Sequence, residues 1–159
     1  MRKTIILALL VFWVATVAGT IFWFSSQTGS ESGEASRGLM EILFSFLDLN
    51  EENKETLHLL VRKGAHMTEY AVLGASVCVL LYYLADMGYL RNACAMGMAG
   101  GALALSSLFA VTDEIHQAFV PGRGPAVRDV LIDAVGAAIG ITAVYLIYRH
   151  KRRSHNHRS

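Results

Sequence analysis

Four long apolar runs divide the sequence and predict four membrane-spanning α-helices. The runs cover residues 4–24, 65–85, 93–120 and 127–148. Each run approaches or exceeds the roughly 20 residues with which an α-helix crosses the hydrocarbon core of a bilayer. A helix also satisfies its own backbone hydrogen bonds, which a lipid environment requires. We therefore predict an all-α, polytopic membrane protein in which residues 1–148 form one four-helix bundle domain.

The first run has a second interpretation, because Arg2 and Lys3 precede it and a signal peptide begins in the same way. The apolar core of a signal peptide usually covers about 7–15 residues, and this run is longer. We therefore favour a membrane span that the protein retains.

The connection between the first two runs predicts an amphipathic segment on the extracytoplasmic side. After polar residues over 25–34, it carries apolar residues that are too few to cross a membrane, namely Leu39, Met40, Ile42, Leu43, Phe44, Phe46 and Leu47. Such a segment suits a helix that lies in the membrane interface. Asn50, followed by Glu51 and Glu52, is typical of a helix start, and this helix can continue into the second span.

The distribution of charge predicts the orientation. The two chain ends and the second connection hold eight basic residues and one acid, a net charge of +7. The other two connections, with the span ends beside them, hold six basic residues and twelve acids, a net charge of −6. Because basic residues near span ends stay inside, we predict a multi-pass protein of the bacterial cell membrane with both termini cytoplasmic. The basic tail, residues 149–159, is then expected to lie on anionic lipid rather than on nucleic acid.

In this orientation, polar residues from all four span ends meet at the outer face. The first span ends in Ser26 and Gln27, for which an ordinary loop start is the alternative. His66, Glu69 and Tyr70 begin the second span and share a helix face, because they lie three and four residues apart. Glu69 could orient the His66 ring as a general base, although a structural pair near the interface has the same spacing.

Two adjacent carboxylates near the end of the third span are costly in lipid. Asp113 and Gln117 share a helix face, and Glu114 lies beside them. A carboxylate within the membrane costs up to about 3 kcal/mol, so it is usually paired or functional. We favour function, and a structural ion pair with Arg123 or Arg128 is the alternative.

The connection to the fourth span predicts an anion-binding arginine. Residues 121–125 read Pro-Gly-Arg-Gly-Pro, a tight turn that presents Arg123 at the membrane surface. A guanidinium matches phosphate and carboxylate bidentately, although an ordinary snorkelling arginine has the same location. Arg62 and Lys63, before the second span, are expected at the same headgroup level.

The fourth span carries one stripe of acids and glycines. Asp129, Asp133, Gly136 and Gly140 recur at helical spacing, so they share a face. The glycine part is typical of close helix packing, and Gly97 and Gly101 of the third span are a plausible partner. The acids then face inward rather than toward lipid.

Together these residues predict a site for an anionic headgroup. The candidates for catalysis are His66, Glu69, Asp113, Glu114 and Gln117. The candidates for substrate binding are Ser26, Gln27, Arg62, Lys63, Tyr70, Arg123, Asp129 and Asp133. We expect no cofactor; a divalent metal on His66, Glu69 and Asp113 is an alternative, although their spacing fits no standard signature.

Several short segments resemble the VanZ-like family in order and spacing. They are Phe24-Ser25-Ser26-Gln27, Arg62-Lys63-Gly64-Ala65-His66 with Glu69-Tyr70 and Leu73-Gly74, Thr112-Asp113-Glu114-Ile115-His116-Gln117 with Phe119-Val120-Pro121-Gly122-Arg123, and Asp129-Val130 with Gly136-Ala137 and Gly140. The resemblance covers the chain from the end of the first span through the fourth. It implies a link to low-level teicoplanin resistance, without implying a settled biochemical activity.

Three functions fit these observations. The first is an enzyme-like site that acts on a lipid-linked cell-envelope precursor or a phospholipid headgroup at the outer leaflet. The second is a non-catalytic protein that binds lipid or glycopeptide. The third is a small transporter, which with four spans would need the homo-oligomer that the glycine stripes allow.

Overall fold

The computed structural model describes residues 1–27, 51–90, 92–124 and 126–156. Within this part of the chain the backbone forms four helices, α1 (Arg2–Ser25), α3 (Glu51–Asp86), α4 (Ala95–Gln117) and α5 (Val127–Asn156). All four are long and apolar enough to cross a membrane, which confirms the predicted all-α fold with four candidate spans. The predicted interfacial segment between the first two spans falls outside the described residues.

The ends of two helices refine the predicted spans. α3 starts at Glu51 and continues unbroken to Asp86, as the residues after Asn50 suggested. α4 stops at Gln117, earlier than the predicted end at Val120. The backbone N–H of Val120 donates to the carbonyl oxygen of Gln117, three residues back, at 3.0 Å, a spacing typical of tightened helix ends. Pro121 disfavours a helical conformation for the residue before it, which explains the stop.

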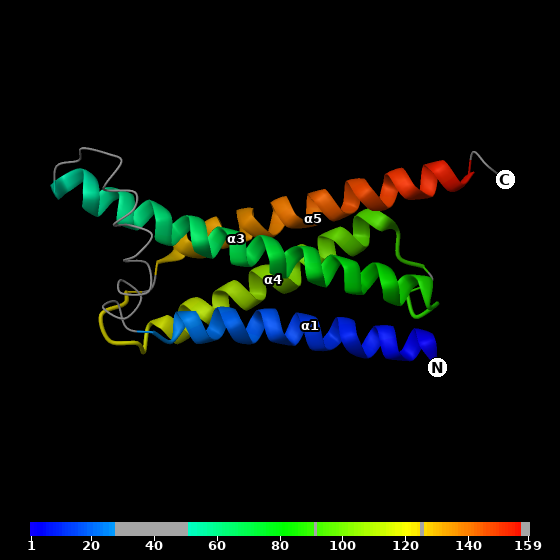
Figure 1. Ribbon diagram of the computed structural model, residues 1–159, viewed down its shortest axis with the longest axis horizontal. Helices are drawn as coiled ribbons and strands as arrows, with labels where there is room; N and C mark the ends of the chain where they lie inside the picture. Colours follow the sequence, from blue (N-terminus) through cyan, green and yellow to red (C-terminus); the bar gives the residue numbers. More distant parts are fainter. Residues whose placement is uncertain (28–50, 91, 125, 157–159) are drawn as a thin grey trace.

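The four helices form an elongated bundle in which the start of α1 and the end of α5 lie at the same end (Figure 1). α3 occupies the centre and packs against α1, α4 and α5, most extensively against α5. The connection between α4 and α5 lies at the opposite end of the bundle (Figure 1). We call this the site end, because the predicted polar residues gather there.

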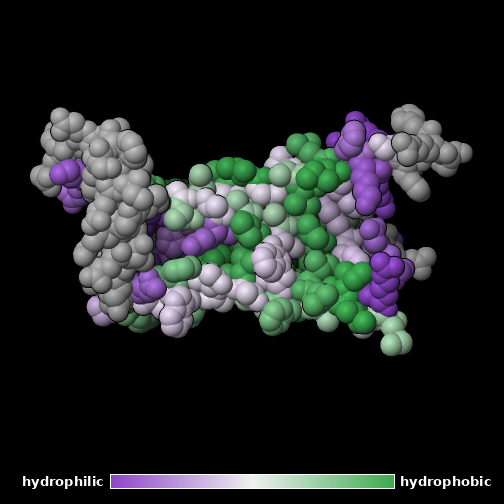
Figure 2. Space-filling model, viewed as in Figure 1, coloured by the Kyte–Doolittle hydropathy of each residue, from purple (hydrophilic) through white to green (hydrophobic). Residues whose placement is uncertain are grey.

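The outer surface of the bundle suits a lipid environment. Large apolar side chains are exposed on every helix, for example Phe12 (71% exposed), Leu108 (62%) and Leu131 (63%). Hydrophobic residues cover the middle of the molecule, and hydrophilic residues are concentrated toward its ends (Figure 2). This distribution of exposed apolar residues is the reverse of the one in a soluble protein and is typical of a membrane bundle.

Glycines bring the backbones of α3 and α5 into direct contact. A Cβ atom on Gly74 would lie 2.7 Å from the carbonyl oxygen of Ala137. A Cβ on Gly140 would overlap the carbonyl oxygen of Ala71, and Gly136 is equally crowded by Met67. The stripe on the fourth span therefore packs closely, as its small residues indicated.

The predicted partner of this stripe was wrong. Gly136 and Gly140 pack on α3 rather than on Gly97 and Gly101 of α4. A Cβ on Gly101 would meet only Leu81 of α3 at 3.7 Å, and one on Gly97 only Cys94 of its own chain segment at 3.5 Å. α3 is the central helix, so the closest backbone approach is made with it.

Gly140→Ala is expected to loosen this contact. The new methyl group overlaps the Ala71 carbonyl oxygen, and overpacking of this kind typically costs about 1–3 kcal/mol. Thermal unfolding in detergent, followed by circular dichroism, should show a clearly lower Tm. Gly100→Ala on α4 is the matched control, because a Cβ there meets nothing within 4 Å. Equal Tm values for the two variants would contradict the assigned packing.

Candidate functional site

A cavity of about 220 Å³ opens at the site end of the bundle. Its walls come from the first half of α3, the end of α4, the following turn and the start of α5. Eight of the thirteen predicted site residues line it, namely Arg62, Lys63, His66, Glu114, Gln117, Arg123, Asp129 and Asp133. The positions of these residues along their helices therefore bring most of the predicted site residues together.

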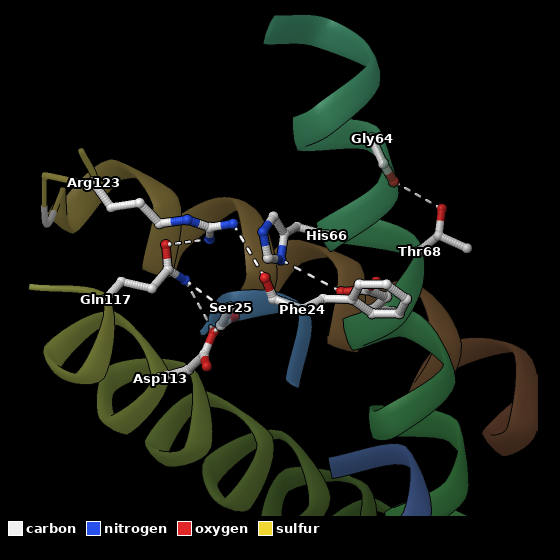
Figure 3. A network of polar contacts seen from close by, with 9 residues as sticks. Phe24, Ser25, Gly64, His66, Thr68, Asp113, Gln117 and Arg123 are labelled. Atoms are coloured by element: carbon white, nitrogen blue, oxygen red, sulfur yellow. Dashed lines mark hydrogen bonds and ion pairs between the residues drawn. The ribbon is translucent and has the colours of Figure 1, made fainter. Parts of the chain in front are cut away.

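Asp113 lies behind this cavity, at the junction of α1 and α4. Its carboxylate is 1% exposed, and its Oδ2 atom accepts a hydrogen bond of 2.7 Å from the Ser25 hydroxyl. The amide of Gln117 donates to the same oxygen at 3.1 Å and to the Ser25 hydroxyl oxygen at 3.3 Å (Figure 3). These bonds tie the last turn of α1 to the last turn of α4.

Arg123 extends this network to the turn between α4 and α5. Its guanidinium donates through Nη1 to Oε1 of Gln117 and through Nη2 to the backbone carbonyl oxygen of Phe24, both at 3.1 Å (Figure 3). The Phe24 carbonyl belongs to the last turn of α1, where a cation is favourable. Gly122 precedes Arg123 with a φ of +77°, a conformation that suits glycine and directs the turn. The arginine is therefore held in place by two helices.

The surroundings of Arg123 disfavour its positive charge. Burial lowers the pKa of its guanidinium, and the nearby positive charge of Arg62 lowers it further. Asp113, Glu114 and Glu69 oppose this shift. Because an arginine still remains protonated, the cavity contains a partly desolvated cation beside a second one.

The suggested ion pair between Asp113 and Arg123 is mediated rather than direct. Gln117 stands between them, donating to the carboxylate and accepting from the guanidinium. The geometry fixes the orientation of the Gln117 side-chain amide, because its nitrogen and oxygen have different partners. Sequence spacing identified Gln117 as a neighbour of Asp113, and the structure adds its link to the turn.

His66 and Glu69, the predicted pair at the start of the second span, lie side by side without a hydrogen bond between them. Nδ1 of His66 lies 3.5 Å from Oε2 of Glu69, an ion-pair distance when the imidazole is protonated. His66 lines the cavity, whereas Glu69 lines a groove between α1 and α3. Tyr70 is fully buried beside Phe109 and does not line the cavity. Its buried hydroxyl has no hydrogen-bond partner among the described residues, and Tyr70 therefore belongs to the core of the bundle.

Other predicted residues form contacts between the elements that line the cavity. Oε1 of Glu114 accepts a hydrogen bond of 2.6 Å from the backbone N–H of Ala126, the residue before α5. Lys63 of α3 forms an ion pair with Asp129 of α5. Asp133 is buried and lines the cavity one turn further along α5. In the part of the chain that the structure describes, no three His, Cys, Asp or Glu side chains lie close enough to hold a metal ion.

Ser25, and not Ser26, joins the network at the end of α1. Ser26 is exposed, and its hydroxyl donates to the Phe22 carbonyl oxygen of its own helix at 2.7 Å. Neither Ser26 nor Gln27 lines the cavity. Ser25 follows buried Ile21 by four residues, so both lie on the inward face of α1. The burial of Ile21 is known only from the structure, so the sequence alone carried no signal that selects Ser25 over Ser26.

Ser25→Ala should destabilise the bundle, because it removes one of two donors to a buried carboxylate. A hydrogen bond to a charged group contributes about 1.5–3 kcal/mol. Thermal unfolding in detergent is the measurement, and Ser26→Ala is the matched control with an expected change within about 0.5 kcal/mol. If Ser26→Ala lowered Tm as much as Ser25→Ala, the assigned network would be wrong.

Comparison with known proteins places the chain in a family. No curated protein and no solved structure matches it. A family model described as VanZ/LLP1 matches residues 5–148, which extend from the start of α1 into α5. The match covers nearly the whole chain, including every residue of the network and the cavity, and it confirms the resemblance carried by the short segments. The chain therefore belongs to the VanZ/LLP1 family.

Proposed function

We propose that the cavity at the site end binds the phosphate-bearing headgroup of an anionic membrane lipid. The observation that carries this proposal is a pair of arginines. Arg62 and Arg123 line the same cavity and are close enough for their charges to interact. Among the described residues, neither forms an ion pair with a carboxylate, whereas Lys63 is paired with Asp129. Two guanidinium groups that lack a carboxylate partner favour an anion with several oxygens.

The electrostatics of Arg123 support the same conclusion. Its pKa is lowered by burial and by Arg62, so the cavity is unfavourable for two positive charges alone. A bound phosphate would offset both effects. The acids that line the cavity, among them Asp133, can accept hydrogen bonds from hydroxyl or amine groups of a headgroup.

The location supports a lipid as the source of the phosphate. The cavity lies at the end of the apolar helices, where the headgroups of a surrounding bilayer are expected. The larger number of basic residues at the opposite end favours the outer leaflet for this end. Phospholipids and lipid-linked envelope precursors both carry phosphate there. If the ligand is such a precursor, binding it would change its exposure to teicoplanin.

Arg62→Gln should weaken lipid binding by roughly 10–100-fold, the equivalent of one charged hydrogen bond. Native mass spectrometry of the purified protein would count retained phosphatidylglycerol, undecaprenyl phosphate and phosphatidylcholine, with soluble phosphate and pyrophosphate as competitors. Wild-type protein should retain an anionic lipid and reject phosphatidylcholine.

Arg128→Gln is the matched control for this experiment, because Arg128 is exposed at the same end and does not line the cavity. It should leave retention unchanged. Equal retention of anionic and zwitterionic lipid by the wild-type protein would refute the proposal. Binding of soluble phosphate with the same affinity as the lipid would show that no lipid is required.

His66 supports a second function, acid–base catalysis on the bound headgroup. It is the imidazole on the cavity wall, and Glu69 behind it could orient the ring or stabilise its protonated form. Asp113, Glu114 and Gln117 are already engaged in hydrogen bonds that join structural elements. Those bonds favour His66 over the other catalytic candidates.

His66→Gln separates the two functions, because glutamine keeps a polar side chain of similar reach but cannot exchange a proton near neutral pH. Wild-type protein would be incubated with the retained lipid, and products would be sought by mass spectrometry. An enzyme should lose about 10²-fold or more of its turnover in this variant while retaining the lipid. An unchanged lipid with wild-type protein across the panel would argue against catalysis and leave binding.

A further inference from the structure

A groove of about 290 Å³ runs between α1 and α3, next to the headgroup cavity. Val17 and Thr20 of α1 form part of one wall, and Thr68 and Val72 of α3 form part of the other. Figure 2 shows the surface hollowed over these helices, with hydrophilic residues beside the hollow. Thr20 and Thr68 are exposed, so the groove is open on the side of the bundle.

The two ends of the groove are chemically different. At the inner end, the indole N–H of Trp13 donates to the Ser76 hydroxyl oxygen at 3.0 Å and joins α1 to α3. At the other end stands Glu69, whose Oε2 lies 3.5 Å from Nδ1 of His66 on the cavity wall. The groove therefore ends at a side-chain hydrogen bond on one side, and only the contact between Glu69 and His66 separates it from the cavity on the other.

The threonines that line the groove offer it no hydroxyl proton. The hydroxyls of Thr16 and Thr20 donate to the carbonyl oxygens of Phe12 and Thr16 in their own helix, both at 2.9 Å. Thr68 donates to the Gly64 carbonyl oxygen at 2.8 Å. A hydroxyl carries one proton, so these side chains have none left for a ligand. The groove therefore suits hydrocarbon better than a polar molecule.

We propose that one hydrocarbon chain of the bound lipid lies in this groove while its anionic headgroup occupies the cavity. This inference rests on the proposed function. From Trp13 to Thr20 the helix rises about 10 Å, which accommodates roughly the first eight carbons of an extended chain. Because the groove is open at the side, the lipid enters from the bilayer without leaving it. A free phosphate would need no such groove.

Fluorescence quenching by brominated lipids tests the proposal directly. The chain has two tryptophans, and Trp23→Phe leaves Trp13 at the groove as the only reporter. The full-length protein would be placed in phosphatidylcholine bilayers with a few per cent of phosphatidylglycerol brominated in its acyl chains. We expect this lipid to quench Trp13 at least twofold more than brominated phosphatidylcholine at the same mole fraction.

Thr20→Phe fills the groove and should abolish the excess quenching. Thr142→Phe is the matched control on α5. Thr142 is also exposed and donates to the carbonyl oxygen four residues earlier, but it does not line the groove. It should leave the quenching unchanged, and a loss equal to that of Thr20→Phe would overturn the proposal.

Native mass spectrometry of the same preparation distinguishes failure of the groove proposal from failure of headgroup binding. Retention of phosphatidylglycerol without excess quenching would overturn the groove and leave headgroup binding intact. Equal quenching by both brominated lipids would mean that bulk lipid fills the groove, which also overturns the proposal. Absence of both retention and excess quenching would overturn the headgroup function and, with it, this inference.

Discussion

Asp113 is a buried acid on α4, where the inward face before it consists mainly of small residues such as Ala99, Ala102 and Ala110. An unpaired carboxylate at this position would be costly in a membrane, so its hydrogen bonds constrain everything around it. Ser25 must face inward from α1, and Gln117 must present its amide nitrogen. The amide oxygen of Gln117 then receives Arg123, which in turn reaches the end of α1. The hydrogen bonds of one buried carboxyl group thus connect two helix ends with the turn that bears the arginine.

The contact of α3 with α5 supplies the other half of the site. Gly74, Gly136 and Gly140 let the two backbones touch, so the residues on either side of that contact are held at a fixed separation. The polar residues consequently divide into two groups. Ser25, Asp113 and Glu114 are engaged in bonds between structural elements. Arg62, His66 and Asp133 line the cavity without a hydrogen bond to another described residue, apart from the long contact of His66 with Glu69.

The sequence predicted the four spans because apolar run length is a direct requirement of the bilayer. Helical phase also predicted local partners such as Asp113 with Gln117 and His66 with Glu69, since those contacts depend on one helix alone. It could not choose between Ser25 and Ser26, because α1 is apolar around its circumference and its rotation is set by contacts with other helices. In the same way, small residues at Gly136 and Gly140 indicated a close neighbour without identifying α3 as that neighbour.

The position of the His66–Glu69 pair, between the cavity and the groove, bears on both binding and catalysis. His66 belongs to the cavity and Glu69 to the groove, so a lipid whose headgroup and chain occupy the two spaces passes directly over this pair. In such a complex, the junction between phosphate and hydrocarbon chain, which contains the hydrolysable ester bonds of the lipid, would lie at this pair. In the proposed complex, a protein that only binds lipid would need no proton donor at that point, because the two arginines would hold the headgroup. The position of His66 is therefore the feature that would make the same arrangement an enzyme.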